Sequence, residues 1–271
     1  MLGRKRPSLA IVCALLLSSS LNAEVKVLKN FTLIDGTGRP PVAESAMIVN
    51  DGRITWIGRT AVLKAPAGAE TADLTGKFVM PGIINLHGHI GNTVDLTQDG
   101  KFYTRKSIEE NLHSMFAYGQ TPLFINDPFF TRSVSQTTLQ LLSNPERQKT
   151  NAAVPHFKEF PGFLETAKKN LKKLADAGVK YGFGTDTGPP GRFPGYAEHW
   201  ELELMVDAGL TPVQALTAAT RSGAEFLGAK DLGTLEVSRW ADLIVLNANP
   251  LTNIKNSRSI HAVYIAGNLV K

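Results

Sequence analysis

Two histidines separated by one glycine carry the clearest metal-binding chemistry in this sequence. His87 and His89 end the apolar run Ile83–His89, which is typical of a buried strand. Residues two apart on a strand point to the same face, so the two imidazoles are expected to converge. Imidazole nitrogens suit zinc and similar divalent metals. The spacing predicts two metal ligands, with a histidine pair at a surface strand end as the alternative.

A carboxylate further along the chain could complete such a site. Asp186 lies in the run Phe183–Gly188, at the end of an expected short strand over residues 179–185. In α/β barrels the active site lies at the C-terminal ends of the strands. Asp186 is therefore a candidate metal ligand and general base. The alternative is that its side chain only caps the following turn.

A third histidine follows the Asp186 loop. His199 lies beside Trp200 in a segment rich in glutamate and leucine. From this position it could border the site and contact the substrate or support a ligand. The alternative is that its ring packs beside Trp200.

The elements that must position these residues are of two kinds, and the first kind occupies both ends of the chain. Short strand-like runs separated by turn residues occur near the start and again in the last forty residues. They cover residues 25–34, 46–49, 53–58, 242–246 and 262–265. We expect the two ends to pack together as one small β-sandwich.

The middle of the chain has a helical, α/β character. Phe163–Ala177 has apolar residues at spacings of three and four, which predicts an amphipathic helix ended by Gly178. Thr211 and Pro212 are start signals for a helix over Pro212–Leu227. A further helix is expected over Ser107–Tyr118. Strands alternating with helices are typical of a parallel sheet or barrel.

The order of these motifs resembles that of the amidohydrolase superfamily, in particular its imidazolonepropionase-like and prolidase-like branch. The motifs are Leu33–Gly36, Met80–Gly82 leading into His87–His89, Gly184–Asp186, Ala218–Thr220, Gly233–Leu235 and Ala241–Leu246. The resemblance implies an α/β fold, in which a metal-dependent hydrolase (β/α) TIM-type barrel joins a β-sandwich formed by the N- and C-terminal segments.

The same resemblance implies the chemistry. His87 and His89 would be the metal ligands of the first barrel strand, and Asp186 the aspartate of the last. The cofactor would be a divalent metal, with zinc expected, and Asp186 would move the proton of a metal-activated water. The reaction would be hydrolysis of an amide, cyclic amide or dipeptide-like carbon–nitrogen bond in a small molecule.

The length of the middle segment departs from this pattern. A barrel of this type takes about 250 residues, whereas residues 78–228 supply only about 150. The bridging lysine or glutamate and the two further histidines of the family's central strands have no identifiable counterparts. We therefore expect an incomplete barrel over 78–228 and a composite sandwich over 24–77 and 229–271. A catalytically inactive exported remnant and a sequence with an internal deletion are the alternatives.

The N-terminus predicts export. Arg4, Lys5 and Arg6 precede a short apolar run over residues 9–17, which is typical of a signal peptide over residues 1–23. We expect a periplasmic or extracellular protein with no membrane span in its mature chain. Without those three cations the formal charge of +5 falls to about +2, so composition does not favour a nucleic-acid partner. The sequence gives no oligomeric state.

Overall fold

The computed structural model of the protein describes most of the chain. The described residues are 25–89, 93–94, 97–102, 104, 126–132, 134–153, 159–188 and 193–270. The expected signal peptide at 1–23 and the expected helix at 107–118 lie outside them. Within these ranges no helix has the length and apolar character that a membrane crossing needs.

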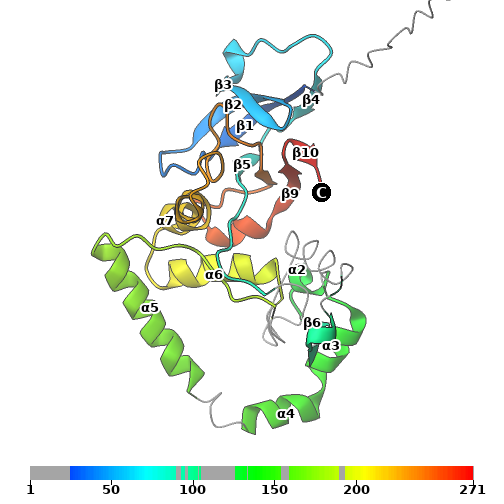
Figure 1. The fold of residues 1–271 in the computed structure, drawn as a ribbon, viewed down its shortest axis with the longest axis vertical. Coiled ribbons are helices and arrows are strands. Elements are labelled where there is room, and N and C mark those ends of the chain that lie inside the picture. The colour runs from blue at the N-terminus through cyan, green and yellow to red at the C-terminus, as the bar shows by residue number, and fades with distance from the viewer. Residues whose placement is uncertain are drawn as a thin grey trace, which may run out of the picture.

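One sheet unites the two ends of the chain. In the described residues it has eight strands in the order β10-β9-β8-β5-β1-β2-β3, with β4 paired to β1 (Figure 1). Its strands are β1 (Lys26–Leu33), β2 (Val42–Asn50), β3 (Arg53–Arg59), β4 (Glu70–Asp73), β5 (Phe78–Pro81), β8 (Leu243–Leu246), β9 (Ile260–Ile265) and β10 (Asn268–Leu269). The join between the ends is the antiparallel pair β5 and β8, in which Pro81 lies opposite Leu243.

One of the hydrophobic core clusters lies within the sheet itself. Its buried side chains come from strands at both ends of the chain, which requires the two halves of the sheet to face a common interior. The cluster includes Leu28, Phe31, Met47, Val49, Ile54, Val79, Leu243, Val245, Ala262 and Tyr264. The expectation that the two ends pack together is therefore confirmed, although they share one continuous sheet.

Three helical segments pack beneath this sheet. They are α6 (Tyr196–Asp207), α7 (Pro212–Thr217) and α8 (Gly223–Leu227), with a π-helical turn over Ala218–Ser222 between the last two. The predicted cap at the start of α7 is confirmed, because the Thr211 hydroxyl accepts from the Gln214 amide at 3.2 Å. The predicted end is confirmed as well, since Gly228 has a left-handed φ of 66°.

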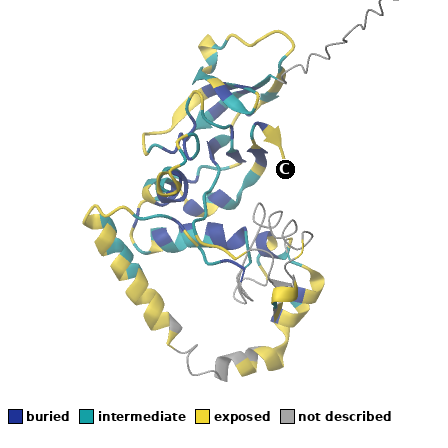
Figure 2. Cartoon of the chain, viewed as in Figure 1, coloured by how far each residue is buried: buried dark blue, intermediate teal, exposed yellow. Residues whose placement is uncertain are grey.

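Four further α-helices lie within the described residues. They are α2 (Pro128–Thr131), α3 (Gln136–Ser143), α4 (Pro145–Ala153) and α5 (Phe160–Asp176), which is the predicted amphipathic helix. Short elements elsewhere are β6 (Thr93–Val94) and β7 (Thr97–Gln98). In Figure 1, α5 extends away from α6 and the sheet. Figure 2 shows α5 largely exposed and α6 largely buried.

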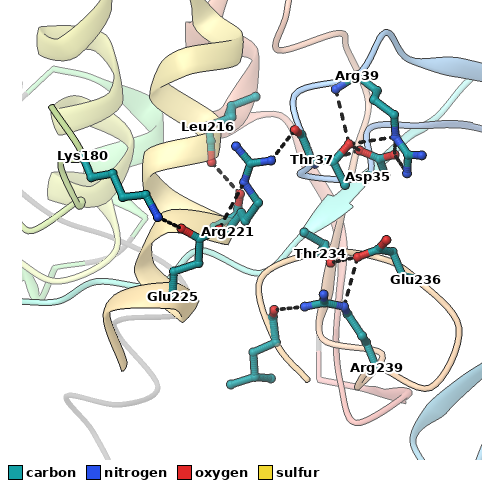
Figure 3. A network of polar contacts seen from close by, with 12 residues as sticks. Asp35, Thr37, Arg39, Lys180, Leu216, Arg221, Glu225, Thr234, Glu236 and Arg239 are labelled. Atoms are coloured by element: carbon teal, nitrogen blue, oxygen red, sulfur yellow. Dashed lines mark hydrogen bonds and ion pairs between the residues drawn. The ribbon is translucent and has the colours of Figure 1, made fainter. Parts of the chain in front are cut away.

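A network of polar contacts connects the sheet to the helices below it (Figure 3). The Arg221 guanidinium donates to the carbonyl oxygen of Thr37 at 2.7 Å, so the loop after β1 is tied to the π-helical turn. The Glu225 carboxylate pairs with Lys180 at 3.1 Å. The second contact is an exposed ion pair that links the start of the segment leading to Asp186 to α8.

Candidate metal centre

The two segments that carry the candidate ligands run side by side in parallel. The Leu86 amide donates to the Phe183 carbonyl at 2.9 Å, and the Asp186 amide donates to the His87 carbonyl at 2.8 Å. Gly88 forms a parallel bridge with Thr187. The strands predicted at 83–89 and 179–185 are not found as regular strands, and the chain bends at Leu86 and His87. The two segments are nevertheless parallel neighbours joined by backbone hydrogen bonds. In a barrel, parallel neighbouring strands end at the same face, so residues at their C-terminal ends lie close together.

The structure brings the three predicted ligands together. The Asp186 Oδ1 atom lies 2.9 Å from His89 Nε2 and 3.4 Å from His87 Nε2. The two imidazole rings have centroids 5.5 Å apart. Asp186 has a φ of 51°, a left-handed conformation that aspartate tolerates better than most residues do. The aspartate therefore turns back toward the histidine pair.

The donor set fits a divalent metal. One ligand atom from each of the three residues lies within 4.8 Å of the other two. Two imidazole nitrogens and one carboxylate oxygen match the three protein ligands of catalytic zinc sites, whose bonds are about 2.0–2.2 Å long. The His87 and His89 side chains are 64% and 44% exposed. Their rings can therefore make the small rotations that a shared ion would require.

A buried polar cluster lies behind the ligands. Asn85 on the first segment donates from Nδ2 to the Thr185 hydroxyl at 2.7 Å and to Glu198 Oε1 at 2.7 Å. Glu198, in the first turn of α6, is only 5% exposed. Burial raises the pKa of its carboxyl group to about 7, although hydrogen bonds from Asn85 and the two neighbouring threonines oppose the rise.

Sequence reasoning missed Asn85 and Glu198. One signal for Glu198 was available, because it follows Gly195 by three residues, the spacing at which a glutamate reaches back to the helix N-cap amide. The structure has this contact, from the Gly195 amide to Glu198 Oε2. The contact between Asn85 and Glu198 joins residues 113 positions apart, and no local pattern marks it.

His199 directly follows Glu198 in α6. Its ring is 5% exposed, its Nδ1 is 3.0 Å from the Ser257 hydroxyl, and it meets the Phe129 ring edge-on at 5.3 Å between centroids. It also lines a cavity of about 220 Å³ together with Asn85 and Glu198. The substrate or supporting role of His199 stays a prediction.

Comparisons with known proteins identify relatives of part of the chain. Residues 142–270 match the model of the Amidohydrolase family. Over 106 residues the chain is 30% identical to the 5-methylthioadenosine/S-adenosylhomocysteine deaminase of Bacillus thuringiensis (strain Al Hakam), covering 36% of this chain and 24% of that enzyme. The deaminase of Bacillus cereus (strain B4264) is 29% identical over the same length. The chain thus spans about a quarter of these curated relatives.

Solved structures support the fold over a larger share of the chain. The A. niger ochratoxinase superposes with a TM-score of 0.66 at 16% identity, covering 92% of this chain and 96% of that one. A Xaa-Pro dipeptidase with bound methionine gives a TM-score of 0.65 at 14% identity, covering 91% and 100%. Phenylurea hydrolase B gives 0.65 at 16% identity, covering 91% and 97%. At such identities the likeness concerns the fold.

Proposed function

We propose that this chain, a member of the amidohydrolase superfamily, is a metal-dependent hydrolase that acts on a carbon–nitrogen bond of a small molecule. The observation that carries the proposal is the convergence of His87, His89 and Asp186 at two neighbouring strand ends. The alternation of the histidines on their segment and the left-handed turn at Asp186 account for that convergence.

The residues divide the chemistry between them. His87 and His89 would hold a divalent metal, zinc in our proposal, through their Nε2 atoms. When bound, such a metal polarises a carbonyl group and lowers the pKa of a bound water to about 7. Asp186 would accept the water's proton on a carboxylate oxygen and deliver it to the leaving nitrogen. Exposure of the imidazoles leaves the ligands accessible to a substrate from solution.

The substrate class follows from the relatives. The superposed structures include a dipeptidase and a phenylurea hydrolase, and the sequence relatives are deaminases. All three names describe attack at a carbon bonded to nitrogen. We propose a dipeptide-like or cyclic amide substrate, and export of the protein by the segment at 1–23 to the periplasm or the exterior.

A second candidate is an inactive exported protein that only binds metal. Within the described residues, one group of histidine, cysteine, aspartate or glutamate side chains is placed to hold a metal, and it contributes three ligands. The imidazoles of this group are exposed. Catalysis gains most when the site excludes water. A metal-loaded chain without hydrolytic activity would favour this candidate.

Metal analysis tests the proposal. The chain without residues 1–23 is dialysed against zinc and analysed for bound metal, then screened for hydrolysis of dipeptides and lactams. We expect stoichiometric zinc and an affinity at least tenfold lower, about 1.4 kcal/mol, in His87→Ala. His261→Ala, which changes an exposed histidine on β9, is the matched control and should bind zinc normally. A wild-type chain that takes up no zinc would contradict the proposal.

A further inference from the structure

We infer that Glu198 is a positioning residue: through Asn85 it holds the two ligand-bearing strand ends at the spacing that one metal ion needs. The inference rests on the proposed function of the three ligands. Glu198 touches none of them, so its action would be indirect. It lies in α6, outside both of the segments that it would hold together.

The two oxygens of Glu198 have separate partners. Oε2 accepts a hydrogen bond from the Gly195 amide, which anchors the carboxylate at the start of α6. Oε1 accepts from Asn85 Nδ2 at 2.7 Å, and it lies 3.2 Å from the Thr185 hydroxyl and 3.3 Å from the Thr187 hydroxyl. One carboxylate thus connects the helix to both segments of the site.

Asn85 transmits this anchor to the backbone of both segments. Its Oδ1 accepts from the His87 amide at 3.1 Å and from the Thr185 amide at 3.2 Å. An amide oxygen accepts and an amide nitrogen donates, so Nδ2 must face the carboxylate for Oδ1 to face the two amides. Glu198 therefore fixes the orientation in which Asn85 bridges the strand ends.

The placement of this cluster relates it directly to the ligands. Asn85 lies two residues before His87, and the two threonines lie on either side of Asp186. Four backbone hydrogen bonds join the two segments, from Leu86 to Phe183, from Thr185 and Asp186 to His87, and from His89 to Thr187. The side-chain contacts of Asn85 add to them next to the candidate ligands. Without the carboxylate, Asn85 Nδ2 and the threonine hydroxyls would lose a buried acceptor, which is costly unless the segments move.

Cobalt(II) titration tests the inference, because its absorption spectrum reports both affinity and coordination geometry. We expect Glu198→Ala to raise the cobalt dissociation constant about tenfold or more, as removal of groups that orient metal ligands typically does. Asn85→Ala should have a similar effect, and the double variant should be no worse than either alone. Glu198→Gln keeps one oxygen as an acceptor for Asn85 but turns its NH2 group toward the Gly195 amide, so its loss of affinity should be smaller than that of Glu198→Ala but not zero.

Glu201→Ala is the matched control. Glu201 is on the same helix and burial also raises the pKa of its carboxyl group, but it takes no part in the hydrogen bonds around Asn85. It should leave the cobalt affinity and spectrum unchanged. Equal affinity in wild type and Glu198→Ala, or an equal loss in Glu201→Ala, would overturn the positioning role while leaving the proposed function intact.

Amide hydrogen exchange of the metal-free protein provides a test that does not depend on metal binding. Glu198→Ala should speed exchange over residues 85–89 and 183–188, whereas β1 and β2 should keep their protection. Unchanged protection of both segments would overturn the inference. If wild type binds no cobalt but the variant still loses this protection, the positioning role stands and the proposed function fails.

Discussion

The terminal sheet and the middle helix α5 differ in how completely they bury their apolar side chains. In the sheet, Phe31 is 1% exposed and Met47 is fully buried. In the middle, α5 leaves Phe163 53% and Leu174 46% exposed, although its sequence has the apolar stripe of a buried-face helix. The candidate metal ligands lie on segments that follow β5 and precede α6 in the chain. The difference indicates that the sheet and α6 to α8 contribute most of the free energy of unfolding. The candidate ligands depend on this part of the molecule for their positions.

A pair of phenylalanine variants gives the largest expected difference. Phe31→Ala should lower the free energy of unfolding by about 3–5 kcal/mol, because it leaves a cavity in the sheet core. Phe163→Ala removes an exposed ring from α5 and should change it by only about 0.5 kcal/mol or less. Urea denaturation followed by fluorescence measures both. Similar losses for the two variants would mean that α5 is packed as firmly as the sheet.

An ion cluster between the C-terminal segment and the helices gives the next effect. Arg258 contacts Asp127 and Glu203, each at 2.6 Å, and is 15% exposed. Arg258→Met would strand two partly buried carboxylates and should cost about 3 kcal/mol. Lys172→Met breaks an exposed pair with Asp176 on α5 and should cost less than about 0.5 kcal/mol. Thermal unfolding would compare them, and a small loss for Arg258→Met would argue that the two regions are only loosely joined.

The pH dependence of stability should show that α6 is part of the buried region formed by the sheet and α6 to α8. Burial raises the pKa of Glu201 from its usual 4.5 to about 7. The folded protein then holds this proton over a range in which the unfolded chain has lost it, so stability is highest below pH 4.5 and falls as pH rises to 7. For this one group the total is on the order of 3 kcal/mol. Because the pKa of Glu198 is raised to a similar value, Glu201→Gln should remove about half of this slope in urea titrations from pH 4.5 to 7.5. An unchanged slope would contradict the burial of Glu201.

Local patterns in the sequence predicted the features that depend on contacts between neighbours in the chain. The alternation of His87 and His89, the cap at Thr211 and the glycine that ends α8 each involve neighbours in the chain, and each is found in the structure. The helices α2 and α3 were not predicted, although Asp127 and Ser135 are capping residues that accept from amides two and three positions on. Their short apolar stretches have no clear period, so packing against α6 determines them.

Contacts distant in the chain were beyond local patterns. The carboxylate of Glu198 meets Asn85 only after the sheet, the two extended segments and α6 have assembled. Nothing in either residue's neighbourhood distinguishes this pair from a surface pair. The family resemblance supplied the ligands and the order of the motifs, whereas the hydrogen bonds that surround them required coordinates.

The pairing of β5 with β8 has a consequence for how the chain can vary. Because Pro81 lies opposite Leu243, everything between them leaves and re-enters the sheet at adjacent points, as an insertion does in a host domain. The entropy cost of closing such an excursion grows only slowly with its length. The host sheet can therefore accept middle segments of very different length, provided that they keep the helices α6 and α7 that pack against Met80, Ile244 and Leu246.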